Sequence, residues 1–95
     1  MNEKSTPQPK IKLGQIVITP GIQATLSHEE VLIALGRHLT GDWGELCPED
    51  WQENERALRE GYRLFSGYLD REGDKFWIIT EGDRSVTTVL LPDEY

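Results

Sequence analysis

Apolar side chains recur along the last third of this chain in three short runs, about 62–69, 75–81 and 84–91, that predict β-strands. The middle run contains the consecutive apolar residues from Phe76 to Ile79, a pattern typical of a central strand that is covered on both faces. Two short polar connections, each containing a glycine, separate the runs, as expected for tight hairpin turns. These residues therefore predict an antiparallel meander.

Two stretches upstream have the spacing of amphipathic helices. The first, about 28–39, opens with a capping box at residues 27–30 and places its apolar side chains about one turn apart. These side chains are Val31, Leu32, Leu35 and Leu39. The second, about 48–60, opens with Pro48 and two acids, and it ends at Gly61, a residue suited to terminate a helix. We expect both helices to pack on the sheet.

A fourth strand is predicted near the start of the chain, over about 14–19, and Pro20-Gly21 is expected to end it as a turn. The predicted fold class is therefore α+β, with two helices on an antiparallel sheet of three to four strands. Residues 1–10 are polar, include two prolines, and predict a disordered tail. Residues 11–95 are expected to form a single domain.

Composition narrows the class of protein. The chain has 95 residues and one cysteine, Cys47, which excludes an internal disulfide and a cysteine-based zinc site. Its apolar runs are all shorter than the roughly 18 residues that a membrane helix needs, and its first residues lack the apolar segment of a secretory signal. We therefore expect a cytoplasmic protein that holds no cofactor and no metal.

The net charge of −7 is unevenly distributed. Residues 1–40 carry four basic and three acidic side chains, whereas residues 41–95 carry six basic and fourteen acidic ones. Such an acidic excess argues against direct binding to nucleic acid, because that affinity comes mostly from clustered Lys and Arg. It favours a basic protein partner, although acidic charge can also serve solubility alone.

Several uncommon segments carry a resemblance. They are Arg37-His38, residues 41–44, Asp50 with Asn54, Arg63, residues 77–81 and residues 83–85. Over residues 16–95 the chain resembles small plasmid-related hypothetical proteins of proteobacterial plasmids and integrated mobile elements. Some of these carry the label of a type I restriction modification M subunit, which this chain does not support, because it lacks a glycine-rich nucleotide motif and room for a methyltransferase domain. The resemblance implies an accessory role for a mobile element in a bacterial cytoplasm.

Candidate catalytic chemistry centres on His38. Neither His28 nor His38 has acidic neighbours at the spacing of metal ligands, so no metal site is predicted. Cys47 and the serines lack a local motif that would mark a nucleophile. One enzyme class stays open, a small toxin-like ribonuclease with His38 as acid or base and with Arg63 and Arg84 on the phosphate. The acidic excess opposes the approach of RNA.

Protein binding is the main expectation. The candidate residues lie in two loops and in the second helix, and they are Asp42, Trp43, Asn54, Glu81, Asp83 and Arg84. If the two loops meet at one end of the sheet, they form a polar patch around an aromatic anchor. The expected partner is a host defence or nucleic-acid-binding protein that this chain inhibits. The alternative is a self-associating module, such as a homodimer formed through an exposed sheet edge.

Three of these candidates also have a purely structural interpretation. Trp43 can close the end of the core, and Asn54 can satisfy a buried backbone group. Arg84 can brace loops by pairing with a carboxylate. Whether the loop around Trp43 meets the turn at Glu81–Arg84 is the geometric question that the sequence leaves open.

Overall fold

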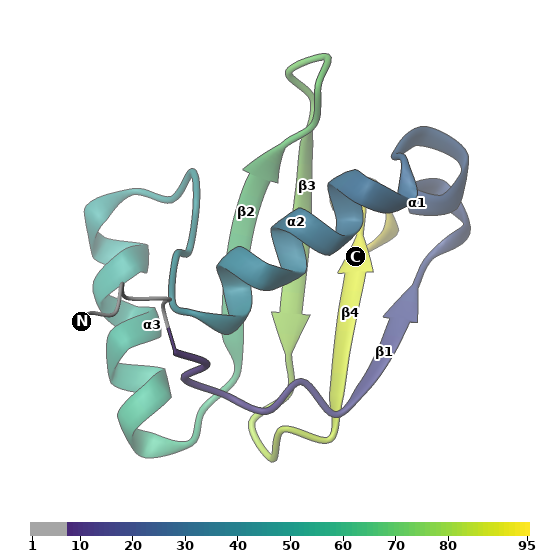
Figure 1. The fold of residues 1–95 in the computed structure, drawn as a ribbon. Coiled ribbons are helices and arrows are strands. Elements are labelled where there is room, and N and C mark those ends of the chain that lie inside the picture. Colours follow the sequence, from purple (N-terminus) through teal and green to yellow (C-terminus); the bar gives the residue numbers. More distant parts are fainter. Residues whose placement is uncertain (1–7) are drawn as a thin grey trace, which may run out of the picture.

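The structure is a computed structural model that describes residues 8–95 and has an α+β fold (Figure 1), which confirms the predicted class. Four strands form one sheet: β1 (Gln15–Ile18), β2 (Leu64–Leu69), β3 (Lys75–Thr80) and β4 (Val86–Leu90). The helices are α1 (Pro20–Thr25), α2 (His28–Leu39), α3 (Pro48–Glu60) and the short 3₁₀ helix η1 (Pro92–Glu94). Residues 1–7, most of the predicted tail, lie outside the described residues, and the Lys10 amide donates to the Leu39 carbonyl oxygen over 2.8 Å.

The sheet is mixed, so the prediction of a purely antiparallel sheet is wrong. Its strand order is β1-β4-β3-β2, and β2, β3 and β4 form the expected antiparallel meander. Strand β1 instead runs parallel to β4, with Gln15 opposite Val86 and Ile18 opposite Val89. The whole chain between β1 and β4 acts as a crossover, so no hairpin fixes the direction of β1.

Helix α1 replaces the turn predicted at Pro20-Gly21. Pro20 occupies the first turn of this helix, and the Thr19 hydroxyl accepts a hydrogen bond from the Ile22 amide. Ile22 is completely buried in the core cluster that contains Val31 and Leu35 of α2. The Glu94 carboxylate of η1 accepts a hydrogen bond from the Gly21 amide over 2.9 Å. A helix of six residues is too short to be stable alone, so these tertiary contacts decide its conformation.

Helix α2 begins with the predicted capping box, in which Ser27 and Glu30 bond each other's backbone amides. Its buried side differs in part from the expected stripe and consists of Val31, Ala34, Leu35 and His38. Leu32 is instead 55% exposed. The helix crosses one face of the sheet, and it is rotated about its own axis relative to the predicted orientation, so that its buried side includes His38.

The core lies on one side of the sheet. Side chains on that side alternate along the strands and include Ile78, Val89 and Leu64, which pack under α2 and beside α3. Among residues 8–95, no α-helix covers the opposite side, which we call the open face. It carries Phe65, Trp77, Ile79, Thr88 and Val17, as the strand register requires. Strand β3 is central, as predicted, and on the open face Ile79 is buried and Trp77 is half-buried against Tyr95 although no α-helix lies there.

The two edges of the sheet differ in whether their outer backbone groups have hydrogen-bond partners. At the β2 edge, the Asn54 side chain pairs with both backbone groups of Phe65. The Gly67 amide donates to the Trp43 carbonyl oxygen, and its own carbonyl accepts from the Glu45 amide over 2.7 Å. Gly44 permits this approach, because its φ is +80° and a Cβ there would collide with the Gly67 carbonyl. The β2 edge is thus closed over these residues.

Candidate functional site

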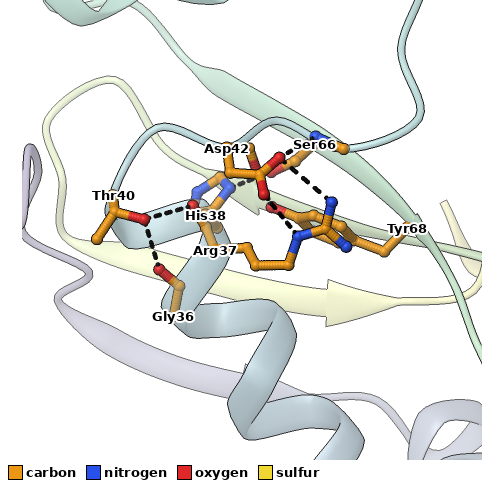
Figure 2. A network of polar contacts seen from close by, with 8 residues as sticks. Gly36, Arg37, His38, Thr40, Asp42, Ser66 and Tyr68 are labelled. Carbon is orange, nitrogen blue, oxygen red and sulfur yellow. Dashed lines mark hydrogen bonds and ion pairs between the residues drawn. The ribbon is translucent and has the colours of Figure 1, made fainter. Parts of the chain in front are cut away.

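The structure buries the aromatic anchor expected in the first loop. Trp43 is 0% exposed and packs with Ala57 and Leu64, while its indole Nε1 donates to Glu55 Oε2 over 2.8 Å. Asp42 forms a forked pair with the Arg37 guanidinium, at 2.8 and 3.2 Å, which lowers the pKa of the Asp42 carboxyl (Figure 2). This loop therefore holds the core and the β2 edge together.

Asn54 also has a structural position. It is buried on α3, and its side-chain amide both accepts from the Phe65 amide, over 2.9 Å, and donates to the Phe65 carbonyl oxygen. A primary amide has the right geometry for this, because it presents one acceptor and one donor side by side, as another strand would. Asn54 therefore completes the sheet edge.

The turn after β3 is held by Arg84. Its guanidinium donates to four carbonyl oxygens, those of Tyr62 (2.6 Å), Glu81 (3.2 Å), Gly82 (3.2 Å) and Ala57 (3.2 Å). Arg84 has a φ of 62°, a left-handed conformation that is unfavourable for a residue with a Cβ. It braces loops as its structural interpretation suggests, but it does so through backbone carbonyls at the end of α3 rather than through carboxylates.

The other two acids of this turn have local partners. Glu81 pairs with Arg63 over 3.4 Å, and Asp83 accepts from the Ser85 amide and hydroxyl over 3.0 and 2.6 Å. Within residues 8–95, no hydrogen bond, ion pair or ring contact joins the Trp43 loop to residues 81–84. Both loops contact α3 at Ala57, but Trp43 and Asn54 are buried, so the six predicted residues do not form one surface patch around an exposed aromatic anchor.

His38 lies in a buried polar chain that crosses the core. Its Nδ1 bonds the Ser66 hydroxyl, and its Nε2 lies 2.8 Å from Thr80 Oγ1. Thr80 Oγ1 lies 2.7 Å from Thr87 Oγ1, and the Thr87 hydroxyl donates to the Leu13 carbonyl oxygen over 2.6 Å. Figure 2 shows the ring beside Ser66, next to the Arg37–Asp42 pair.

The last hydrogen bond of this buried network, at Leu13, fixes the tautomer of His38. Because a carbonyl oxygen can only accept, the Thr87 hydroxyl donates to Leu13 and must accept a hydrogen bond from Thr80. Thr80 in turn must accept from His38, which places the imidazole proton on Nε2 and leaves Nδ1 to accept from Ser66. Burial, with a smaller contribution from Arg84, lowers the pKa of His38 to about 4. His38 is therefore neutral near pH 7.

A Ser–His pair is the arrangement that nucleophilic catalysis uses, but here both side chains are 0% exposed. Arg63 and Arg84, the other members of the predicted ribonuclease set, bond to Glu81 and Tyr95 and to backbone carbonyls. In this structure, His38 is therefore buried while both arginines are bonded to other groups. Sequence reasoning missed Ser66 and the two threonines, because only the strand register brings them to His38.

A different group of side chains is accessible on the open face. Phe65, Trp77 and Tyr95 form a row of edge-to-face rings, with centroids 5.0 and 5.9 Å apart. Arg63 donates to the Tyr95 hydroxyl over 2.8 Å, and these four residues with Ile79 line a cavity of about 300 Å³. We call this cavity the aromatic cleft.

A second cavity adjoins it between α3 and β2. It measures about 320 Å³, and Asp50 and Glu53 supply its carboxylates. Arg63 and Phe65 line both cavities, so the acidic cavity and the aromatic cleft lie next to each other. The sequence contains one signal for this site, since hairpin pairing of the two strands places Phe65 opposite Ile79 and beside Trp77.

Comparison with known proteins and a search for metal-binding groups do not point to a particular chemistry. No family model, curated protein or solved structure matches this chain. Within residues 8–95, no group of three or more His, Cys, Asp or Glu side chains could hold a metal ion. In the same part of the chain, every helix is too short or too polar to cross a membrane.

Proposed function

We propose that this protein is a small binding protein that holds a basic segment of a partner protein across the aromatic cleft and the acidic cavity beside it. The observation that carries the proposal is that the two cavities adjoin and share Arg63 and Phe65 in their linings. One side offers aromatic rings, and the other offers carboxylates. Arginine and lysine side chains are suited to both, because their stems are apolar and their ends are cationic.

The charge of this site supports a basic partner. Arg63 is the only cation that lines either cavity within the described residues, and Glu81 already pairs with it. Asp50 has no ion pair among residues 8–95, and Glu53 has only a long one, 3.9 Å, to Arg56. A basic segment would therefore gain two carboxylate partners and would displace at most one weak internal pair.

The open face supplies the apolar part of the interaction. Arg63 already lies over the Tyr95 ring, 5.9 Å from its centroid, whereas a partner arginine over the Trp77 ring gains about 0.5–1 kcal/mol at an exposed site, and more as water is excluded. Aromatic anchors beside a charged rim are the usual composition of a protein-binding surface. This site replaces the two-loop patch as the proposed interface.

We further propose that the partner is a host protein whose basic surface binds nucleic acid or serves in defence, and that this chain competes for that surface as an accessory of a mobile element. The support is the acidic excess of residues 41–95 and the resemblance of residues 16–95 to plasmid-related proteins. A protein of net charge −7 is repelled by nucleic acid but attracted to the sites that bind it.

Calorimetric titration with a capped peptide of about eight arginines tests the site. The double variant Asp50→Lys/Glu53→Lys should weaken binding about tenfold or more, since each reversal removes an attraction of about 0.5–1 kcal/mol and adds a repulsion. The control Glu72→Lys/Asp74→Lys makes the same charge change in the exposed β2–β3 hairpin and should weaken binding much less. Equal losses in both variants would show only general attraction to an acidic protein and would overturn the site.

A further inference from the structure

The second edge of the sheet, β1, has the opposite character from the closed β2 edge. Within residues 8–95, no other strand pairs with its outer side, as Figure 1 shows. The Gln15 and Thr19 amides donate inward to the carbonyl oxygens of Ser85 and Val89, which turns the backbone groups of Ile16 and Ile18 outward. Among the described residues these outward groups have no backbone hydrogen-bond partner, so the edge can accept another strand.

The side chains of this edge are apolar on both faces. Ile16 is 44% exposed on the helix side, and Val17 is 39% exposed on the open face. Ile16 and Ile18 also form one wall of an apolar groove of about 410 Å³, which Leu26, Val31 and Leu32 line from the helices. Exposed apolar area that continues into a groove and an unpaired strand is typical of an interface.

The absence of charge from β1 favours a second copy of this chain as the occupant. Glu94, at the end of the strand, already accepts hydrogen bonds from the Thr19 hydroxyl and the Gly21 amide. Two copies that meet at this edge keep their acidic cavities at the far edges of the joined sheet. The strand itself, Gln15–Ile18, has no charged side chain to oppose its own image.

We propose that two copies of this chain pair their β1 strands antiparallel about a two-fold axis at Val17, which joins the two sheets into one. In this register Ile16 lies opposite Ile18 of the second copy and exchanges both backbone hydrogen bonds with it. Val17 then faces Val17 of the second copy as a non-hydrogen-bonded pair, which agrees with its inward-turned backbone groups. The two apolar grooves meet on the helix side, and the open face continues across both copies.

Sedimentation equilibrium from about 1 μM to about 500 μM tests the oligomeric state. The proposal expects the mass to rise with concentration from 10.9 kDa towards twice that value. Val17→Lys, which places two cations opposite each other at the axis, should weaken association at least tenfold. Leu69→Lys makes the same kind of change on β2, where Leu69 is 49% exposed, and should leave association unchanged. A monomer at every concentration, or equal effects of the two variants, overturns the proposal.

A cysteine pair tests the register and does not depend on how Val17→Lys folds. In a Cys47→Ser background, Val17→Cys should form an interchain disulfide readily, because the two Cα atoms of such a pair lie about 4.5 Å apart. Gln15→Cys should not, since two copies of residue 15 lie several residues apart along the paired strands. Cross-linking at residue 15 but not at residue 17 overturns the register. Val17→Lys should leave the affinity for the arginine peptide unchanged, so failure of this pairing and failure of the proposed function are separate results.

Discussion

Acidification should destabilise this fold through one buried imidazole, and the size of the effect follows from its environment. His38 is neutral in the folded protein, where its pKa is about 4, and it takes up a proton below about pH 6.5 once the chain unfolds. The folded state is therefore fully favoured above pH 6.5, and that advantage is lost as the pH falls to 4. A difference of about 2.5 pKa units corresponds to about 3 kcal/mol of unfolding free energy.

Protonation also conflicts with the hydrogen bonds. A charged imidazole carries protons on both nitrogens, so Nδ1 could no longer accept from Ser66. The carboxylates with lowered pKa, among them Asp42 and Glu94, act in a different window, since their stabilisation is present above about pH 4 and is lost below it. Between pH 6.5 and 4.5, the loss should therefore come mainly from His38.

Urea denaturation followed by circular dichroism at several pH values between 7.5 and 4.5 measures this loss. The control is His38→Gln, which keeps a polar side chain in the core but does not titrate, and which retains the exposed His28. Its unfolding free energy should be lower at pH 7.5 but nearly flat down to pH 4.5, whereas that of the native sequence should fall. Parallel curves for the two proteins would refute the assignment of the pH dependence to His38.

Three substitutions test the bracing of the sheet by urea denaturation at pH 7.5. Asn54→Ala should cost about 2–3 kcal/mol, because both backbone groups of Phe65 lose their partner in a half-buried place, and a cost below about 0.5 kcal/mol would contradict this. Gly44→Ala should cost more than Gly73→Ala, since both glycines have positive φ but only the first would drive a Cβ into a carbonyl; equal costs would show that the edge contact is unimportant. Arg84→Ala should destabilise by about 2 kcal/mol and Arg84→Gly by about 1 kcal/mol less, because glycine relieves the left-handed backbone; the reverse order would refute that explanation.

Local patterns predicted the elements that local interactions determine. The capping box before α2, Pro48 at the start of α3, and the glycine-containing turns of the meander each gave bounds close to those of the structure. The direction of β1 and the existence of α1 depend instead on contacts with β4 and with η1, from distant parts of the chain. No periodicity within residues 14–25 encodes those contacts.

The candidate site residues also divide into those whose positions follow from local chemistry and those whose positions depend on distant contacts. For Trp43 and Asn54 the structural interpretation describes their positions, because a large aromatic and a mid-helix amide are suited to a core and to a sheet edge. His38 lies three residues after Leu35 and seven after Val31, so helical spacing could have placed it on the buried side. The aromatic cleft was not predicted, because a continuous apolar run such as 76–79 does not reveal which of its faces a helix will cover.

A ¹⁵N NMR titration with the capped arginine peptide tests most directly whether the aromatic cleft and the acidic cavity beside it form the binding site. The largest shifts should fall on the Trp77 indole and on the amides of Phe65, Asp50 and Glu53, with little change at the buried indole of Trp43. Shifts centred on the acidic hairpin at residues 70–74, or spread evenly over all exposed carboxylates, would contradict this location of the site.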